Sequence, residues 1–201
     1  VLQDKVHLFM GGLLASTGAI GSLALLGGAP ALAQGTTLAV AAQGLPDSLI
    51  TGFSSFASLN LISQMLEPLV ATDAHGKLVP RLAISWTPES PDTWRFRLRE
   101  GVKFHDGKPF SADDVKFTLD YIIAPKSLYG TKARISRIDN VTVVDGSTIV
   151  IKTKGPFPTL LNGLTNIPIE PKHDVESAGR SGMTAAPIVT GPFKLARWGP
   201  G

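Results

Sequence analysis

The sequence predicts a mixed α+β fold. Two strand signals stand on either side of an amphipathic helix that begins after Ser111. The first is period-2 alternation at residues 94–99, and the second is a hairpin pattern around Asp145-Gly146. Hydrophobic residues make up 43% of the chain and charged residues 17%, which is enough apolar material for a buried core. Because the strands and helices do not follow a regular βαβ order, the expected class is α+β.

The first 33 residues differ in composition from the rest of the chain. Lys5 precedes an apolar stretch from Leu8 to Leu26, and Ala31-Leu32-Ala33 follows it. This is the order of a secretory signal peptide with an A-x-A cleavage site. We therefore expect residues 1–33 to be removed, a mature chain that starts at Gln34, and a periplasmic protein. An uncleaved membrane anchor is the alternative, and the many glycines of the stretch disfavour it.

The next elements are predicted from short apolar patterns. Residues 38–42 form an apolar run typical of a buried strand. A helix is expected from Ser58, because apolar residues recur at helical spacing until Pro68 stops or bends the chain; they are Leu59, Ile62, Leu66 and Leu69. A turn at residues 73–76 then leads into residues 78–80.

The segment 94–99 gives the clearest strand signal. Three apolar residues alternate with three arginines, so Trp94, Phe96 and Leu98 should be buried and Arg95, Arg97 and Arg99 should face water. A row of arginines could bind an anion, but a solvated sheet face explains the alternation by itself. A second strand is expected over residues 102–104, followed by a tight turn at Asp106-Gly107.

The helix after Ser111 has a predicted capping box. Ser111 stands at the N-cap, Asp114 follows three residues later, and the buried stripe consists of Val115, Leu119 and Ile122. Pro125 should end this helix. Further along, residues 141–143 and 149–151 should pair as a hairpin, residues 157–164 should form a short helix, and Thr190 should open a last strand.

Sequence motifs for catalysis are absent. The sequence has no nucleophile elbow, phosphate-binding loop, dinucleotide fingerprint or zinc-protease motif. His105 beside Asp106 could be a ligand pair or a base with its orienting carboxylate, but turn chemistry explains the pair better. Adjacent Asp113 and Asp114 point in different directions on a helix and are better explained by capping. We expect no enzyme, no metal site and no cofactor.

Charge and cysteine content exclude further classes. The net charge of +3 is too small, and the basic residues too evenly spread, to predict a nucleic-acid partner. The sequence contains no cysteine, so disulfides, thiolate metal sites and a lipid-modified N-terminal cysteine are not expected. The protein is therefore not predicted to be a lipoprotein.

Four blocks of sequence resemble one protein family. Glu67-Pro68-Leu69-Val70 with residues 76–86 is similar to the family stretch "EPLV … GxxxPxLAxSW", and residues 94–110 resemble "WTFxLRxGVKFHDGxPF". Residues 111–117 resemble "xAxDVxF", and residues 190–198 resemble "GTGPYxLxxW". This family is the peptide, opine and nickel class of extracellular solute-binding proteins, which serve ABC transporters. The resemblance runs from about Leu38 to the last residue with the blocks in the family's order.

The resemblance implies a periplasmic-binding-protein-like lobe one with an extra subdomain. Residues 34–75 would start lobe one, residues 76–187 would form the subdomain, and residues 188–201 would return to lobe one. The second lobe would be missing. We therefore expect the 201 residues to be a fragment that binds its solute more weakly than a two-lobed protein.

The resemblance also implies a function and a binding wall. A protein of this kind captures a peptide, opine, nickel complex or sugar outside the cytoplasm and delivers it to a membrane permease, as a monomer. The alternative is a secreted enzyme without a recognisable catalytic site. The expected ligand-binding residues lie after the first strand and at the start of the next helix, with two weaker candidates in the subdomain; they are Gln43, Ser54, Ser55, Phe56, Tyr129 and Asn166. The alternative for the serines is ordinary capping, and for Phe56 a place in the core.

Overall fold

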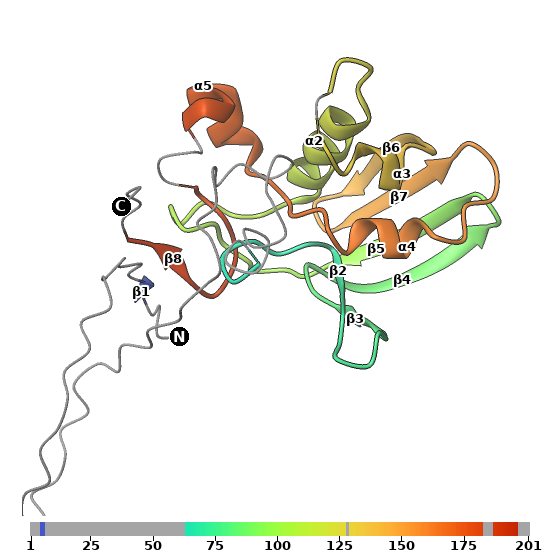
Figure 1. Ribbon diagram of the computed structural model, residues 1–201, viewed down its shortest axis with the longest axis horizontal. Coiled ribbons are helices and arrows are strands. Elements are labelled where there is room, and N and C mark those ends of the chain that lie inside the picture. Colours follow the sequence, from blue (N-terminus) through green and yellow to red (C-terminus); the bar gives the residue numbers. More distant parts are fainter. Residues whose placement is uncertain (1–4, 7–62, 128, 183–186, 197–201) are drawn as a thin grey trace, which may run out of the picture.

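A four-stranded antiparallel sheet with helices beside it dominates the computed structural model, which describes residues 5–6, 63–127, 129–182 and 187–196 (Figure 1). The strand order is β4-β5-β7-β6. These strands are β4 (Ala83–Ser90), β5 (Thr93–Leu98), β6 (Ile138–Asp145) and β7 (Thr148–Thr153). The mixture of strands and helices confirms the predicted α+β class.

The register of the sheet separates a core face from a solvent face. Phe96 of β5 stands between Trp86 of β4 and Ile149 of β7, and its side chain is fully buried. Arg97, the next residue, stands between Ser85 and Thr148 on the opposite face. The side chains on each face follow from the two-residue repeat of a strand.

The alternation predicted for β5 is confirmed in its main part. Phe96 and Leu98 are buried, and Arg97 and Arg99 are exposed. Trp94 is only half-buried, although it packs against the core. Arg95 is also half-buried, because its Nε lies 2.5 Å from Glu89 Oε1 in an ion pair that crosses to β4.

Two strand predictions differ from the structure. Strand β4 was not predicted, because its sequence is polar and contains Pro88, which lacks a ladder N–H. Pro88 is tolerated because, among the described strands, β4 pairs with β5 alone and forms the edge of the sheet. The strand predicted at residues 102–104 is absent, because Lys103 forms only an isolated bridge with Pro109 across the turn. Gly107 in that turn has a φ of 89°, as a tight Asp-Gly turn requires.

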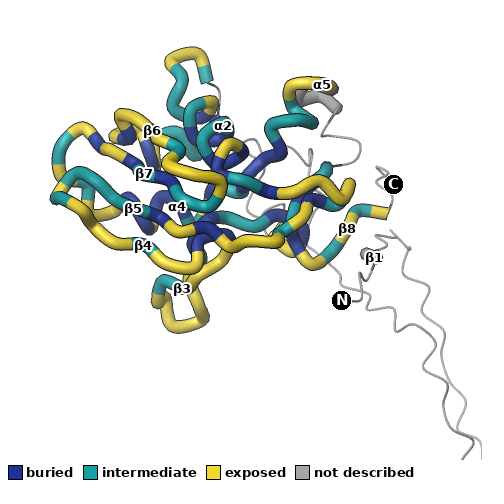
Figure 2. Tube along the Cα trace, turned by 180° about the vertical axis from the view of Figure 1, so that it is seen from behind, coloured by how far each residue is buried: buried dark blue, intermediate teal, exposed yellow. Residues whose placement is uncertain are grey.

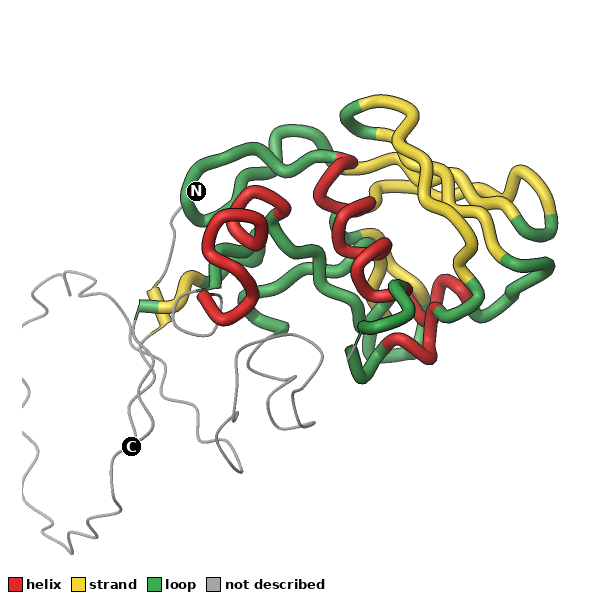
Figure 3. Tube along the Cα trace, turned by 90° about the horizontal axis from the view of Figure 1, so that it is seen from above, coloured by secondary structure: helices red, strands yellow, loops and turns green. Residues whose placement is uncertain are grey.

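Helix α2 (Ala112–Ile123) covers the core face of the sheet and packs mainly on β6, as Figures 1 and 3 show. Its stripe of Val115, Leu119 and Ile122 is fully buried, as predicted. The predicted capping box is present: the Ser111 N–H donates to Asp114 Oδ2 over 2.9 Å. Asp114 Oδ1 accepts the Lys172 N–H over 3.0 Å, so one buried carboxylate joins the starts of two helices.

The remaining elements are short. They are β1 (Lys5–Val6), β2 (Val70–Thr72), β3 (Leu78–Pro80), α3 (Lys132–Ile135), α4 (Leu160–Leu164), α5 (Lys172–Gly182) and β8 (Lys194–Leu195). Strands β2 and β3 form a hairpin around Gly76, and β6 and β7 form the predicted hairpin around Asp145-Gly146. Helix α4 is shorter than predicted, and the last strand is the two-residue β8, which pairs in parallel with β1.

The helix predicted from Ser58 to Leu69 is not continued in the described part of the chain. Residues 63–65 form a turn, and Pro68 makes an isolated bridge to Pro168. Pro68 restricts Glu67 to extended conformations, which ends helical geometry before Leu69. Leu66 and Leu69 are nevertheless buried. The rest of this prediction, and the strand predicted at 38–42, lie outside the described residues.

In the part of the chain that the structure describes, buried apolar residues form two clusters. The larger one lies between the sheet, α2 and α4 and extends from Leu69 to Ile169. The smaller one contains Met65, Leu66 and Val189. Figure 2 shows the buried segments inside the sheet and the exposed segments at the hairpin ends. In the described residues, no helix is long and apolar enough to cross a membrane.

Candidate functional site

Tyr129 stands at the centre of a buried polar network. Its hydroxyl donates to the Glu170 carboxylate at Oε1, and only 5% of Tyr129 is exposed. Its ring meets the ring of Tyr121 edge to face, with centroids 6.2 Å apart. Glu170 is completely buried. Tyr129 is therefore packed into the core side of the molecule, with its polar end turned to a carboxylate.

The same network joins α2 to the segment before α5. The Thr118 hydroxyl donates to Asp114 O over 2.8 Å and accepts the Glu170 N–H over 3.0 Å. Thr118 is fully buried. A buried hydroxyl costs free energy unless it has partners, so these bonds fix the distance between the helix and the segment.

Asn166, the second predicted residue in the described part, lies apart from this network. It is exposed, and its Nδ2 donates to the neighbouring Thr165 Oγ1 over 3.0 Å. Within the described residues, no hydrogen bond connects Asn166 with Tyr129. The other four predicted ligand-binding residues, Gln43, Ser54, Ser55 and Phe56, lie outside the described residues.

His105 and Asp106 form a structural junction. The His105 N–H donates to Val189 O over 2.9 Å, and its ring Nε2 lies 2.8 Å from Gly191 O. The Lys194 ammonium donates to His105 O over 3.2 Å. The turn is thereby fastened to the segment that enters β8.

Asp106 joins this junction to α5. Its Oδ2 lies 2.9 Å from His173 Nε2, and its Oδ1 accepts the Lys108 N–H over 3.0 Å. Burial by itself would raise the pKa of Asp106, but the bonds from Lys108 and His173 outweigh it and hold the pKa below its usual value. Both groups of the His105-Asp106 pair are thus engaged with structural partners, which favours the turn interpretation over a catalytic one.

Gly191 allows a close backbone approach to Met65 beside the junction. Its N–H donates to Met65 O over 2.7 Å. A Cβ at this position would lie 2.1 Å from the same oxygen, so a side chain could enter only if the backbone moved.

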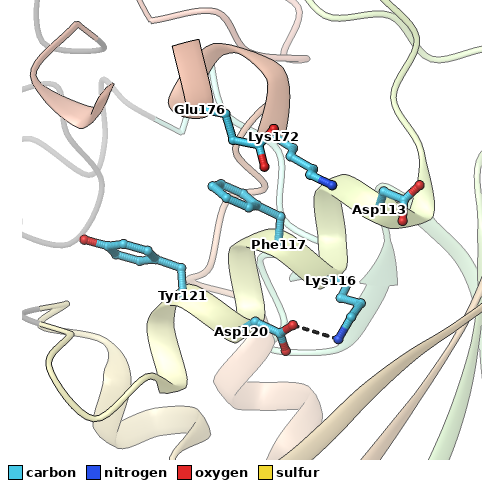
Figure 4. Close-up of a pocket in the computed structure, with 7 residues that line it drawn as sticks. All are labelled: Asp113, Lys116, Phe117, Asp120, Tyr121, Lys172 and Glu176. Atoms are coloured by element: carbon cyan, nitrogen blue, oxygen red, sulfur yellow. Dashed lines mark hydrogen bonds and ion pairs between the residues drawn. The ribbon is translucent and has the colours of Figure 1, made fainter. Parts of the chain in front are cut away.

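A hollow of about 500 Å³ opens between α2 and α5 (Figure 4). We call it the α2–α5 hollow; it is lined by Asp113, Lys116, Phe117, Asp120, Tyr121, Lys172 and Glu176. Lys116 and Asp120 form an ion pair of 2.7 Å on α2. The hollow combines two aromatic rings with charges of both signs. Within the described residues, no three His, Asp or Glu side chains gather into a possible metal site.

Sequence reasoning missed Glu170, Thr118 and His173. Thr118 carried a usable signal, because a polar residue inside the apolar stripe of a helix is expected to bond within the core. Glu170 and His173 gave no signal, since their partners Tyr129 and Asp106 are distant in sequence.

Known proteins resemble this chain in sequence. The family model of the bacterial extracellular solute-binding proteins, family 5 middle region, matches residues 77–201. A Brucella ovis protein named "Putative ABC transporter peptide-binding protein" is 34% identical over 197 residues, which covers 92% of this chain and 37% of that protein. The glutathione-binding protein of Pectobacterium atrosepticum is 29% identical over 83% of this chain and 36% of its own length. The chain thus spans little more than a third of these relatives.

Solved structures resemble it in fold as well. NikZ from Campylobacter jejuni, in complex with Ni(L-His), matches 79% of this chain and 32% of its own with a TM-score of 0.71 and 29% identity. AgaA from A. tumefaciens R10, in complex with agropinic acid, matches 79% of this chain and 33% of its own with a TM-score of 0.73 and 28% identity. Most of this fold therefore occurs in solved proteins that were bound to chemically different small solutes.

Proposed function

Because the chain belongs to the bacterial extracellular solute-binding proteins of family 5, we propose that it acts as the extracytoplasmic solute-binding component of an ABC importer. It captures a small peptide-like solute and delivers it to the permease in the membrane. The family match over residues 77–201 carries this proposal. A peptide-like solute is favoured because the names of the Brucella and Pectobacterium relatives specify peptide and glutathione binding.

The binding wall proposed for this chain follows the sequence prediction. Gln43, Ser54, Ser55 and Phe56 supply an amide, two hydroxyls and an aromatic ring, a combination suited to a peptide backbone and an apolar side chain. Tyr129 and Asn166 are proposed to lie near that wall. Because the Tyr129 hydroxyl is engaged with Glu170, we assign Tyr129 a supporting role in this proposal, and we assign the contact with solute to exposed Asn166.

A catalytic function is not proposed. The relatives are binding proteins by name, and the pair that the sequence offered as base and orienting carboxylate is held by structural partners: His105 by Gly191 and Asp106 by His173. A hydrolase would need a nucleophile beside its base and an oxyanion donor. A panel of peptidase and esterase substrates tests this proposal, and turnover that Asp106→Asn abolishes would contradict it.

Solute capture is tested by uptake. Deletion of the encoding gene should lower the uptake of one labelled class among tripeptides, glutathione, an opine and nickel–histidine, and the restored gene should recover it. Calorimetry with the purified protein and the same four solutes should identify the same class. Unchanged uptake of all four, together with no measurable binding heat, would contradict the proposed function.

Export is tested separately. We propose that the segment before Gln34 directs the protein to the periplasm and is removed there. N-terminal sequencing of the periplasmic protein should therefore begin at Gln34. Recovery of an uncleaved chain in the membrane pellet would contradict cleavage and support an anchor.

A further inference from the structure

The outer face of α2 carries two aromatic side chains that the core does not require. The core is filled by Val115, Leu119 and Ile122, which are fully buried on the inner face. Phe117 and Tyr121 stand one turn apart outside that stripe, and 39% of Tyr121 is exposed. The solvent side of an amphipathic helix is normally polar. These two rings therefore call for an explanation other than core packing.

The residues that line the α2–α5 hollow are already held in place by other contacts. The ring of Tyr121 packs edge to face on buried Tyr129, at an interplanar angle of 76°. Lys116 is fixed by Asp120, and its ammonium also donates to Val141 O over 2.9 Å. Walls that are fixed before a ligand arrives lose little conformational entropy on binding.

Unpaired charges of both signs flank the rings. Asp113 of α2 and both Lys172 and Glu176 of α5 form no ion pair with any described residue, unlike Lys116 and Asp120. Figure 4 shows Lys172 extending from α5 toward α2 above Phe117, with Glu176 on the same side of the hollow and Asp113 at the start of α2. The α2–α5 hollow thus offers an ammonium and two carboxylates around an aromatic floor.

We propose that the α2–α5 hollow binds a zwitterionic amino acid with an aromatic or large apolar side chain. The ligand carboxylate pairs with Lys172, the ligand ammonium pairs with Glu176 or Asp113, and the ligand side chain packs on Phe117 and Tyr121. A volume of about 500 Å³ is of the size found for small-molecule pockets. This inference does not rest on the solute wall proposed above.

The ligand's two charges can be tested separately. The full chain, labelled with ¹⁵N, is titrated with L-phenylalanine, with phenethylamine, which lacks the carboxylate, and with 3-phenylpropionate, which lacks the ammonium. L-Phenylalanine should shift the amide signals of α2 and α5 with a dissociation constant on the order of 1 mM, as expected for a ligand of this size in an open site. Each one-charge analogue should bind about tenfold more weakly, since it loses one charge-assisted bond. Equal affinity for all three compounds, or shifts confined to other residues, would overturn the proposal.

Variants test the protein side. Lys172→Gln should weaken L-phenylalanine binding about tenfold while leaving the weaker binding of phenethylamine unchanged. Glu176→Gln should weaken L-phenylalanine and leave 3-phenylpropionate unchanged. Lys152→Gln, on the solvent face of β7, is the matched control and should change neither. If Lys172→Gln and Glu176→Gln melt like the parent and bind L-phenylalanine equally well, the hollow is not its site. If peptide uptake is normal but L-phenylalanine shifts no amide signal of α2 or α5, this inference is wrong and the proposed function stands.

Discussion

Replacement of Tyr129 by Phe separates a structural role from a solute-binding role. The substitution keeps the buried ring and its edge contact with Tyr121, and removes only the hydroxyl that donates to Glu170. Glu170 has no exposed surface, so water cannot easily replace the lost donor. Loss of one donor to a buried acceptor costs about 1–3 kcal/mol. We expect the free energy of unfolding to fall by about 2 kcal/mol.

Urea denaturation measures this change directly. For a chain of this size, about 2 kcal/mol corresponds to a fall in Tm of about 4–8 °C. Val144→Ala on the exposed side of β6 is the control for a surface truncation, because half of the Val144 side chain is exposed, and it should stay within about 0.5 kcal/mol. Equal stability of Tyr129→Phe and its parent would refute the view that this bond holds the segment before α5.

Solute binding gives the second measurement. If Tyr129 acts only through Glu170, Tyr129→Phe should leave the affinity for the transported solute within about twofold of the parent. A larger loss of affinity than of stability would instead identify Tyr129 as a solute contact, as the sequence resemblance implies.

Three further substitutions test the fold and its junction. Phe96→Ala should lower the free energy of unfolding, measured in urea, by about 3–5 kcal/mol because the ring is fully buried. Arg97→Ala on the solvent face should change it by less than about 0.5 kcal/mol. A larger loss for Arg97→Ala than for Phe96→Ala would mean that the two faces are assigned the wrong way round. Gly191→Ala should lower the free energy of unfolding by about 2–3 kcal/mol, because the added Cβ would meet the Met65 backbone. A change within measurement error would show that the backbone there can move to admit a side chain. Folding lowers the pKa of Asp106, so its ionised form stabilises the fold at pH values above the usual pKa of 3.8. The parent should therefore be more stable to unfolding than Asp106→Asn at neutral pH, and this difference should disappear as the pH falls below 3.8. A difference in stability that persists in acid would contradict this linkage.

Local patterns predicted the elements that depend on neighbouring residues. The capping box of α2, its buried stripe and the hairpin of β6 and β7 were all visible, because each is defined within a few residues. No local pattern predicted strand β4. Its polar, proline-containing sequence is acceptable only at the edge of a sheet, and that position is decided by tertiary structure.

The candidate site was less predictable for the same reason. Tyr129 was selected through the family resemblance, but nothing in the sequence pairs it with Glu170. The α2–α5 hollow likewise depends on a contact between two helices that are separated by α3, the hairpin and α4. Contacts of this kind are set when helices pack, and a pattern along one helix does not contain them.

The strand order has a consequence for how the chain folds. Strands β6 and β7 meet through a short turn, as do β4 and β5, so both hairpins can form early from local contacts. The central pairing of β5 with β7 must instead close a loop that contains α2 and α3. Such non-local closure is slow and entropically costly. We infer that assembly of the sheet is limited by the joining of two preformed hairpins, and that Ile149 and Phe96, which face each other across that join, meet late in folding.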